Sequence, residues 1–214
     1  MAENGTGEGA ERVETGDSTV TEWMRRLALP VGDPGGGAAS AVMLGVACAL
    51  TAMVARYSGG RRGGGDDVDG DWLEELAARA DERRAKALAL ADVDAERSRE
   101  YGAAFHVPAG PEHDEAVRTA GERAAESSET IGDLALEARH DLREVAGVTA
   151  RFLLPDALVA TAALRAAIVG ARTNLEADAG GLPEAEVAEH VGRYDEAVEH
   201  LDRLETELRE RLRG

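Results

Sequence analysis

The feature that most constrains this chain is an apolar run at residues 38–55, which contains no charged side chain. It has the length at which a transmembrane helix becomes a candidate. The run is mostly alanine, however, and its transfer into lipid would be weakly favourable; no second span follows it. We therefore expect the buried central helix of a bundle, and no membrane partner.

Helix signals recur along the rest of the chain, and no stretch shows the period-two alternation typical of strands. Glycine and proline breakers predict about six helices, at residues 18–29, from the glycines at 35–37 to about 57, and at 71–105, 111–145, 155–180 and 183–213. Asp17 or Ser18 would cap the first, and the charge-rich sixth would face solvent. The prediction is an all-α bundle of long antiparallel helices over residues 17–214, preceded by a disordered acidic tail at residues 1–16.

Charge and cysteine content limit the partners and the compartment. The net charge of −18 argues against a nucleic-acid partner. Lys86 is the only lysine among 24 basic residues, a pattern that fits either a halophile or a GC-rich source. The single cysteine, Cys48, rules out an intramolecular disulfide, and the N-terminus does not resemble a signal peptide. We expect a cytoplasmic protein in which Cys48 is a core residue.

Gly35, Gly36 and Gly37 come immediately before the apolar helix. Free backbone N–H groups at such a helix start can receive a carboxylate, a phosphate or a ligand carbonyl. The alternative is a tight turn that lets the first two helices pack closely. The triplet lacks the Gly-Lys-Ser/Thr ending of a phosphate loop, so the pattern alone leaves both interpretations open.

Asp94 lies on the apolar stripe of the third expected helix. Steps of three or four residues from it lead to Ala80, Ala87, Leu90, Tyr101 and Phe105. A buried carboxylate is costly unless it is paired, and its pKa is often shifted toward values that suit acid/base chemistry. Asp94 is therefore a candidate catalytic residue, or else the structural partner of an arginine on a neighbouring helix.

Asp156 and Asn174 lie on one face of the fifth expected helix. Asp156 stands in the first turn, where a carboxylate stabilises the helix dipole whether or not it takes part in chemistry. The two residues are separated by about five helical turns, or about 27 Å. Both therefore cannot touch the same small reacting centre within one subunit.

A glycine-rich loop carries Arg61 and Arg62, whose guanidinium groups either bind a carboxylate-bearing substrate or are merely solvated. The acidic segment at residues 66–71 does not complete a calcium loop, because no placement gives both the required glycine and glutamate. The five histidines show no zinc-ligand spacing. The sequence therefore predicts no metal site.

Several of these motifs, taken in order, resemble the cyclodeaminase/cyclohydrolase family over about residues 18–182. The family has a P-G-G-G turn into an Ala-rich helix that ends in M-V-A, which is similar to residues 34–37 and 53–55 here. Its basic G-K-K-K-Y loop resembles residues 60–62. A D-A-x-A-F motif ahead of L-P-K resembles Asp94 and its neighbours, and an S-D later followed by G-A-x-x-N-V resembles residues 155–156 and 170–175.

The chain departs from the family pattern at four positions. Arg97 and Ser98 replace the A-F of the D-A-x-A-F motif, and Ala109 stands in place of the lysine. Asp178 replaces a second asparagine that usually follows the first by four residues. Such changes could alter the substrate preference or abolish the activity.

The resemblance implies an enzyme of one-carbon metabolism that acts on a tetrahydrofolate. It would hydrolyse 5,10-methenyltetrahydrofolate to 10-formyltetrahydrofolate, or cyclise formiminotetrahydrofolate with loss of ammonia, without a metal or redox cofactor. Asp94 is expected as the catalytic carboxylate, with Asp156 second. Arg61 and Arg62 would bind the glutamate tail, Gly35 to Gly37 and Asn174 would contribute to substrate binding, and the apolar surface predicts a homodimer. The alternative is a non-catalytic ligand-binding or subunit-interface protein of the same fold.

Overall fold

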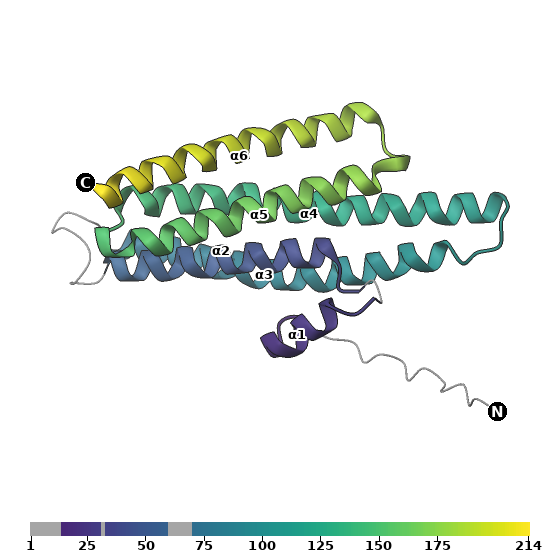
Figure 1. Cartoon of the computed structure of the whole chain (residues 1–214), viewed down its shortest axis with the longest axis horizontal. Coiled ribbons are helices and arrows are strands. Elements are labelled where there is room, and N and C mark those ends of the chain that lie inside the picture. Colours follow the sequence, from purple (N-terminus) through teal and green to yellow (C-terminus); the bar gives the residue numbers. More distant parts are fainter. Residues whose placement is uncertain (1–13, 31–32, 60–69) are drawn as a thin grey trace.

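The protein is represented by a computed structural model that describes residues 14–30, 33–59 and 70–214. These residues form helices and turns without any strand, which confirms the all-α prediction. In chain order the elements are α1 (Val20–Leu27), α2 (Gly36–Gly59), α3 (Gly70–Ala104), α4 (Pro111–Val148), η1 (Arg151–Leu153), α5 (Leu154–Asp178), η2 (Ala179–Gly181) and α6 (Glu184–Arg213). Figure 1 shows the five long helices side by side, with the short α1 against the bundle.

The start of α1 corrects the sequence prediction. Its N-cap is Thr19, whereas the sequence predicted Asp17 or Ser18. The Glu22 N–H donates to Thr19 Oγ1 at 3.2 Å, while the Thr19 N–H donates to Glu22 Oε2 at 3.1 Å. This reciprocal capping box satisfies two backbone donors that the helix itself cannot pair, and it sets the helix boundary.

Residues 14–16, which the sequence analysis assigned to the acidic tail, are among the described residues. Both the backbone N–H and the hydroxyl of Thr15 donate to Asp92 Oδ1 on α3, at 2.8 and 2.6 Å. The indole N–H of Trp23 in turn donates to Thr15 Oγ1 at 3.1 Å. These bonds hold α1 and the segment before it against α3. The remaining residues of the expected tail, 1–13, lie outside the described chain.

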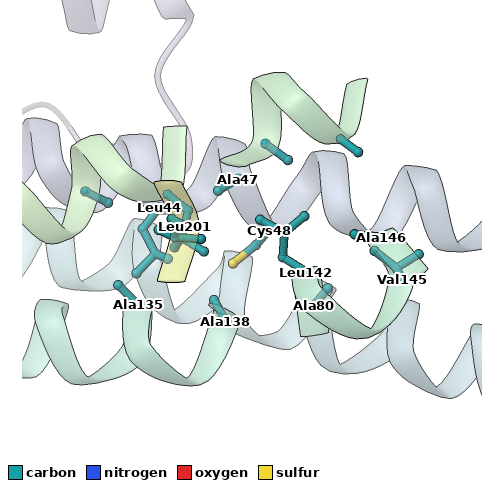
Figure 2. Packing of buried hydrophobic residues seen from close by; sticks show 14 of the residues in the cluster. Leu44, Ala47, Cys48, Ala80, Ala135, Ala138, Leu142, Val145, Ala146 and Leu201 are labelled. Carbon is teal, nitrogen blue, oxygen red and sulfur yellow. The ribbon is translucent and has the colours of Figure 1, made fainter. Parts of the chain in front are cut away.

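The apolar helix α2 is the centre of the bundle and packs against α3, α4 and α5. Its buried side chains are mostly alanine, which allows neighbouring helices to approach closely. Figure 2 shows Leu44, Ala47 and Cys48 packed among side chains of other helices, including Leu142 and Leu201. Cys48 is 1% exposed, and burial raises the pKa of its thiol to about 12, as expected for a core residue.

Two helical segments within the described residues are apolar and long enough to cross a membrane by length and composition alone. They are α2 and residues 151–181, of which the second was not expected from the sequence. Core helices pass the same test, and 61% of the apolar window of α2 is buried in the bundle. Both segments are therefore interpreted as parts of the helical core, and the absence of a membrane partner stays a prediction.

Helix α6 lies along α5 and α4 and is only partly solvent-facing, contrary to expectation. It buries one face against them, led by Tyr194, Leu201 and Leu208. The Tyr194 hydroxyl donates to the Glu129 carbonyl of α4 at 3.2 Å. A Cβ atom on Gly132 would lie 2.3 Å from the same hydroxyl oxygen, so this close approach requires glycine.

Candidate functional site

Asp94 of α3 lies against the first turn of α2. It is 5% exposed, which confirms the burial predicted from its position on the stripe. A Cβ atom on Gly37 would stand 2.2 Å from Asp94 Oδ1 and 2.7 Å from Oδ2, so only glycine leaves room for the carboxyl. Backbone N–H groups in the first turn of a helix have no intrahelical acceptor, and they carry the positive end of the helix dipole. The glycines thus bring the Asp94 carboxyl to a position that favours negative charge.

Few polar groups surround this carboxyl. The Ser127 hydroxyl of α4 donates to Asp94 Oδ1 over a long 3.5 Å, and Oδ2 is buried with no hydrogen-bond partner among the described residues. Burial raises the pKa of Asp94, and the neighbouring Ala38 N–H and the hydroxyls of Ser127 and Ser98 offset this only in part. The Asp94 carboxyl is therefore shielded from solvent, and its Oδ2 atom is available to accept a proton.

Asp141 provides an internal comparison, because it is equally buried but fully paired. Arg79 Nη2 lies 3.3 Å from Asp141 Oδ1, and Arg83 donates to Oδ2. No arginine or lysine of the described chain forms an ion pair with Asp94. The interpretation of Asp94 as the structural partner of an arginine is thus not supported, whereas it describes Asp141 well.

Asn174 of α5 contacts the residue of α2 that precedes Gly37. Its Oδ1 would lie 3.3 Å from a Cβ atom on Gly36, and its Nδ2 donates to the Gly170 carbonyl at 2.8 Å. The close approach of α2 and α5 continues at Gly170, where a Cβ atom would collide with Ser40 Oγ at 2.0 Å. The first turn of α2 is therefore in contact with both Asp94 and Asn174, two of the candidates from the sequence.

The loop before α2 is fixed by a carboxylate shared between two arginines. Arg26 of α1 donates from Nε to the Asp33 carbonyl at 3.0 Å and from Nη2 to Asp33 Oδ1 at 3.3 Å. Arg99 of α3 donates to Asp33 Oδ2 at 3.0 Å. This network ties the start of the glycine turn to α1 and to α3, where Arg99 follows Asp94 by five residues. Gly35 accepts the first α2 bond, from the Ala39 N–H.

Asp178 lies at the end of α5, one turn after Asn174, and it was not a predicted site residue. It is half-buried, and burial together with the negative charge of Asp94 raises its pKa to about 6. Its backbone carbonyl would lie 3.3 Å from a Cβ atom on Gly121 of α4. The sequence reasoning treated Asp178 only as a departure from the family pattern. The one-turn spacing from Asn174 is the signal that could have placed it in the site.

Asp178 also lines an open cavity of about 300 Å³ at the edge of the site. The other lining residues come from α3, α4 and η2, among them Tyr101, His113, Asp114, Arg118 and Gly121. Arg118 does not compensate Asp178, because its guanidinium donates to Glu115 Oε1 at 2.6 Å and to Glu122 Oε1 at 2.5 Å. The site is therefore acidic overall, which suits a cationic ligand.

Of the other sequence candidates, Asp156 stands apart. It is half-buried in the first turn of α5, about 27 Å along the helix from Asn174. Arg61 and Arg62 lie outside the described residues. Within the described ranges no group of histidine, cysteine, aspartate or glutamate is arranged to hold a metal ion.

The four departures from the family pattern differ in how they relate to Asp94. Ser98 hydrogen-bonds to the Asp94 carboxyl, and the negative charge of Asp94 helps to raise the pKa of Asp178. Arg97, by contrast, donates to Glu100 at 2.9 Å, and Ala109 is exposed in the turn between α3 and α4. Ser127 was missed by sequence reasoning altogether. It reaches Asp94 from another helix, across a separation in sequence that local spacing does not reveal.

Comparisons with known proteins agree with the fold and the motifs. Residues 19–197 match the family model described as Formiminotransferase-cyclodeaminase. The chain is also similar to the crystal structure of formiminotetrahydrofolate cyclodeaminase from Thermotoga maritima, with a TM-score of 0.78 and 20% sequence identity. The superposition covers 94% of this chain and 98% of that chain, so the whole fold is shared. No curated protein matches the sequence significantly.

Proposed function

Because the chain belongs to the formiminotransferase-cyclodeaminase family, we propose that it is an enzyme acting on the one-carbon unit of a tetrahydrofolate. The reaction is either hydrolysis of 5,10-methenyltetrahydrofolate to 10-formyltetrahydrofolate or cyclisation of formiminotetrahydrofolate with loss of ammonia. One observation carries the proposal: the Asp94 carboxyl is buried against the first turn of α2, and no cation of the described chain pairs with it.

Asp94 suits the chemistry of either reaction. The methenyl bridge is a delocalised cation, so a carboxylate beside it in a dry site stabilises its charge more strongly than water does. The same carboxylate can take a proton from an attacking water molecule. Its raised pKa, caused by burial, makes it a better base than an exposed aspartate.

The remaining residues would bind the rest of the substrate. Asp94 packs against Gly37 and Asn174 against Gly36. Asn174 and the backbone of Gly35 to Gly37 would contact the pterin ring or the tail. Arg61 and Arg62 would hold the glutamate carboxylates of the tail. Asp156 lies too far along α5 to reach the same centre, so a catalytic role for it requires a second copy of the chain, in the homodimer that we also propose.

Both reactions move only water or ammonia and protons, and so the proposal includes no metal or redox cofactor. The buried thiol of Cys48 and the acidic surface are compatible with a cytoplasmic protein. The lack of a metal or redox cofactor is proposed from the chemistry of the two reactions. The cytoplasmic location is proposed from the amino-acid composition.

Absorbance of the methenyl chromophore tests the function directly. Purified protein should remove the chromophore of methenyltetrahydrofolate faster than buffer alone, or should generate it from formiminotetrahydrofolate with release of ammonia. The Asp94→Asn protein is the matched control and should be slower in the same assay. A folded wild-type protein that accelerates neither reaction would contradict an enzymatic role and favour the non-catalytic alternative.

A further inference from the structure

We propose that a pocket between α4 and α6 binds a phosphate group, at a site separate from Asp94. The inference does not depend on the proposed folate chemistry. The pocket has a volume of about 280 Å³, and its lining residues are Arg139, His140, Arg143, His200, Leu201, Arg203, Leu204 and Glu207. It combines a cationic wall with an apolar floor.

The charge of this pocket is opposite to that of the protein as a whole. The chain carries 42 acidic residues against 24 basic ones, and its net charge is −18. The pocket lining reverses this ratio, with three arginines and two histidines against one glutamate, Glu207. Even with neutral histidines the lining keeps two positive charges, which match a phosphate dianion. Anions, which the acidic surface repels elsewhere, are therefore attracted to this pocket.

Arg139 of α4 has no counter-ion among the described residues. Its Nη1 lies 3.0 Å from His200 Nδ1 on α6, and it forms no ion pair with a carboxylate of that part of the chain. His200 Nδ1 also lies 2.8 Å from the Glu196 carbonyl oxygen. A ring nitrogen that carries a proton donates and one without a proton accepts, so these two contacts cannot both be hydrogen bonds. In either case the charge of Arg139 is left without a neutralising carboxylate.

Both positions of the His200 ring proton leave donors for an anion. If Nδ1 accepts from Arg139, the proton of the neutral ring is on Nε2, which is then a donor. If Nδ1 donates to the Glu196 carbonyl, Arg139 loses its acceptor on the ring. A guanidinium has five N–H donors, of which one ring nitrogen can take only one. A ligand with several acceptor oxygens satisfies the others.

The arginines of α4 repel each other. Arg139 and Arg143 are four residues apart, so they lie on one face of the helix, and like charges at this spacing are slightly destabilising. Arg143 donates to Glu207 of α6, which offsets the charge of Arg143 but not that of Arg139. A bound anion removes the remaining repulsion.

Helix α6 supplies a further cation and the floor of the pocket. Arg203 Nη1 lies 3.7 Å from Glu199 Oε2, which is beyond hydrogen-bond distance, and both side chains are largely exposed. An ion pair of this kind contributes little to stability, so Arg203 can turn toward an anion at small cost. Leu201 and Leu204 are buried beneath the polar groups. Their apolar surface strengthens hydrogen bonds to a ligand above them.

The arrangement of the donors favours a phosphate over a single carboxylate. Donors reach the pocket from both helices, so the ligand needs acceptor oxygens that point in several directions. A tetrahedral phosphate presents such oxygens, whereas those of a carboxylate lie in one plane. Guanidinium groups also bind phosphate through two parallel hydrogen bonds.

The pocket lies apart from the Asp94 site and partly outside the family match. Ser127, which reaches Asp94 from α4, precedes Arg139 by 12 residues, or about 18 Å along the helix axis. The lining residues that α6 supplies, from His200 to Glu207, follow the residues 19–197 that match the family model. A ligand at this pocket is therefore distinct from the substrate at Asp94.

Calorimetric titration of the full-length protein with inorganic phosphate, at neutral pH and low salt, tests the proposal. The wild-type protein should bind one phosphate per chain in a saturable way. Arg139→Gln should weaken binding at least about tenfold, the scale of a lost charge-assisted hydrogen bond, and should melt like the wild type because no carboxylate of the described residues depends on Arg139. Arg165→Gln is the matched control, since Arg165 donates to Asp202 at 2.8 Å outside the pocket, and it should leave the affinity nearly unchanged.

Glu207→Gln provides a test that a folding defect cannot imitate. It removes the only acidic residue of the lining and frees Arg143, so phosphate should bind several-fold more tightly. Asp202→Asn changes the net charge by the same amount outside the pocket and should have little effect. A wild-type protein without saturable phosphate binding would overturn the proposal. Equal changes in each variant and its control would do so too, because only the overall charge would then matter.

Two further ligands identify the source of the phosphate group. Glycerol 3-phosphate that binds at least as tightly as inorganic phosphate would assign the pocket to a small phosphate ester. Tighter binding of inorganic phosphate would assign the pocket to the free ion. Glutarate, a dicarboxylate of similar charge, should bind more weakly than either, and tighter binding of glutarate would overturn the assignment to phosphate.

Discussion

The Asp94 carboxyl occupies the space that any side chain on residue 37 would need, with its Oδ1 2.2 Å from where a Cβ atom would stand. Gly37 lies inside α2, so the requirement for glycine comes from this contact and not from an unusual backbone angle. Contacts this close between a carboxyl and the first turn of a helix make residue 37 a sensitive probe of the site.

Gly37→Ala should displace the Asp94 carboxyl and lower both stability and activity. Forcing a methyl group into this space should cost about 1–3 kcal/mol of unfolding free energy, as overpacking usually does. Gly192→Ala on α6 is the control, because nothing lies within 4 Å of a Cβ atom there and alanine favours a helix. Thermal melts and folate kinetics of both variants provide the measurement. Equal stability of the two alanine variants would show that the Asp94 carboxyl can move aside freely.

Asp94→Asn should reduce turnover roughly a hundredfold or more, the scale expected for a positioned acid/base group. Its melting temperature should stay level or rise, because burial penalises the charged carboxylate and no arginine of the described chain depends on it. Asp141→Asn should behave in the opposite way, since it leaves Arg79 and Arg83 without their partner and should cost about 3 kcal/mol or more. An Asp94→Asn protein with normal turnover would remove Asp94 from the mechanism.

The sequence was sufficient to predict the fold, since breakers and apolar periodicity locate all the long helices. It was less reliable at the ends of helices. Phe105, which the stripe on α3 predicted to be buried, is 56% exposed. The reason is tertiary: α3 and α4 extend together beyond the other helices, so this end of the stripe has no bundle to pack against (Figure 1).

Part of the site was also predictable. The position of Asp94 on an apolar stripe indicated its burial, and the family motifs pointed to Gly36, Gly37 and Asn174, which the fold brings next to it. Asp178 was open to prediction from its one-turn spacing after Asn174, but Ser127 could not be found in this way, because it reaches Asp94 from another helix. Local spacing carries no information about such contacts between distant segments.

Arg61→Ala combined with Arg62→Ala should raise KM for a folate with a glutamate tail more than for a folate without one. Only the tailed substrate loses a charge-assisted contact. Arg56→Ala is the control, because Arg56 is already engaged by Glu74 at 3.3 Å and Asp81 at 2.7 Å. The comparison of KM values for both substrates decides the question. The same increase for both would mean that the two loop arginines do not bind the tail.

The protein should be a homodimer at micromolar concentration. Large apolar side chains stay exposed on the two most apolar helices, including Val46 on α2 and Val159 and Val169 on α5. A surface of this kind is usually covered by a partner. Light scattering should give twice the monomer mass. Val159→Glu should lower the measured mass, whereas Thr206→Glu, at an exposed position of α6, should not. A monomeric wild-type protein would contradict the prediction.

Asp178→Asn should stabilise the protein at neutral pH but not in acid. The pKa of Asp178 is raised from an ordinary 3.8 to about 6 in the folded state, so the folded protein binds this proton more tightly than the unfolded chain does. Below about pH 4 both states are protonated and the carboxyl costs nothing. As the pH rises toward 6 the unfolded chain loses its proton first, and wild-type stability falls relative to the variant by roughly 1–3 kcal/mol, with solvent screening reducing the figure. Denaturant unfolding of both proteins from pH 4 to pH 7 measures this difference, in which the contributions of all other titrating groups largely cancel. A difference that stays constant with pH would mean that Asp178 titrates as an ordinary surface aspartate.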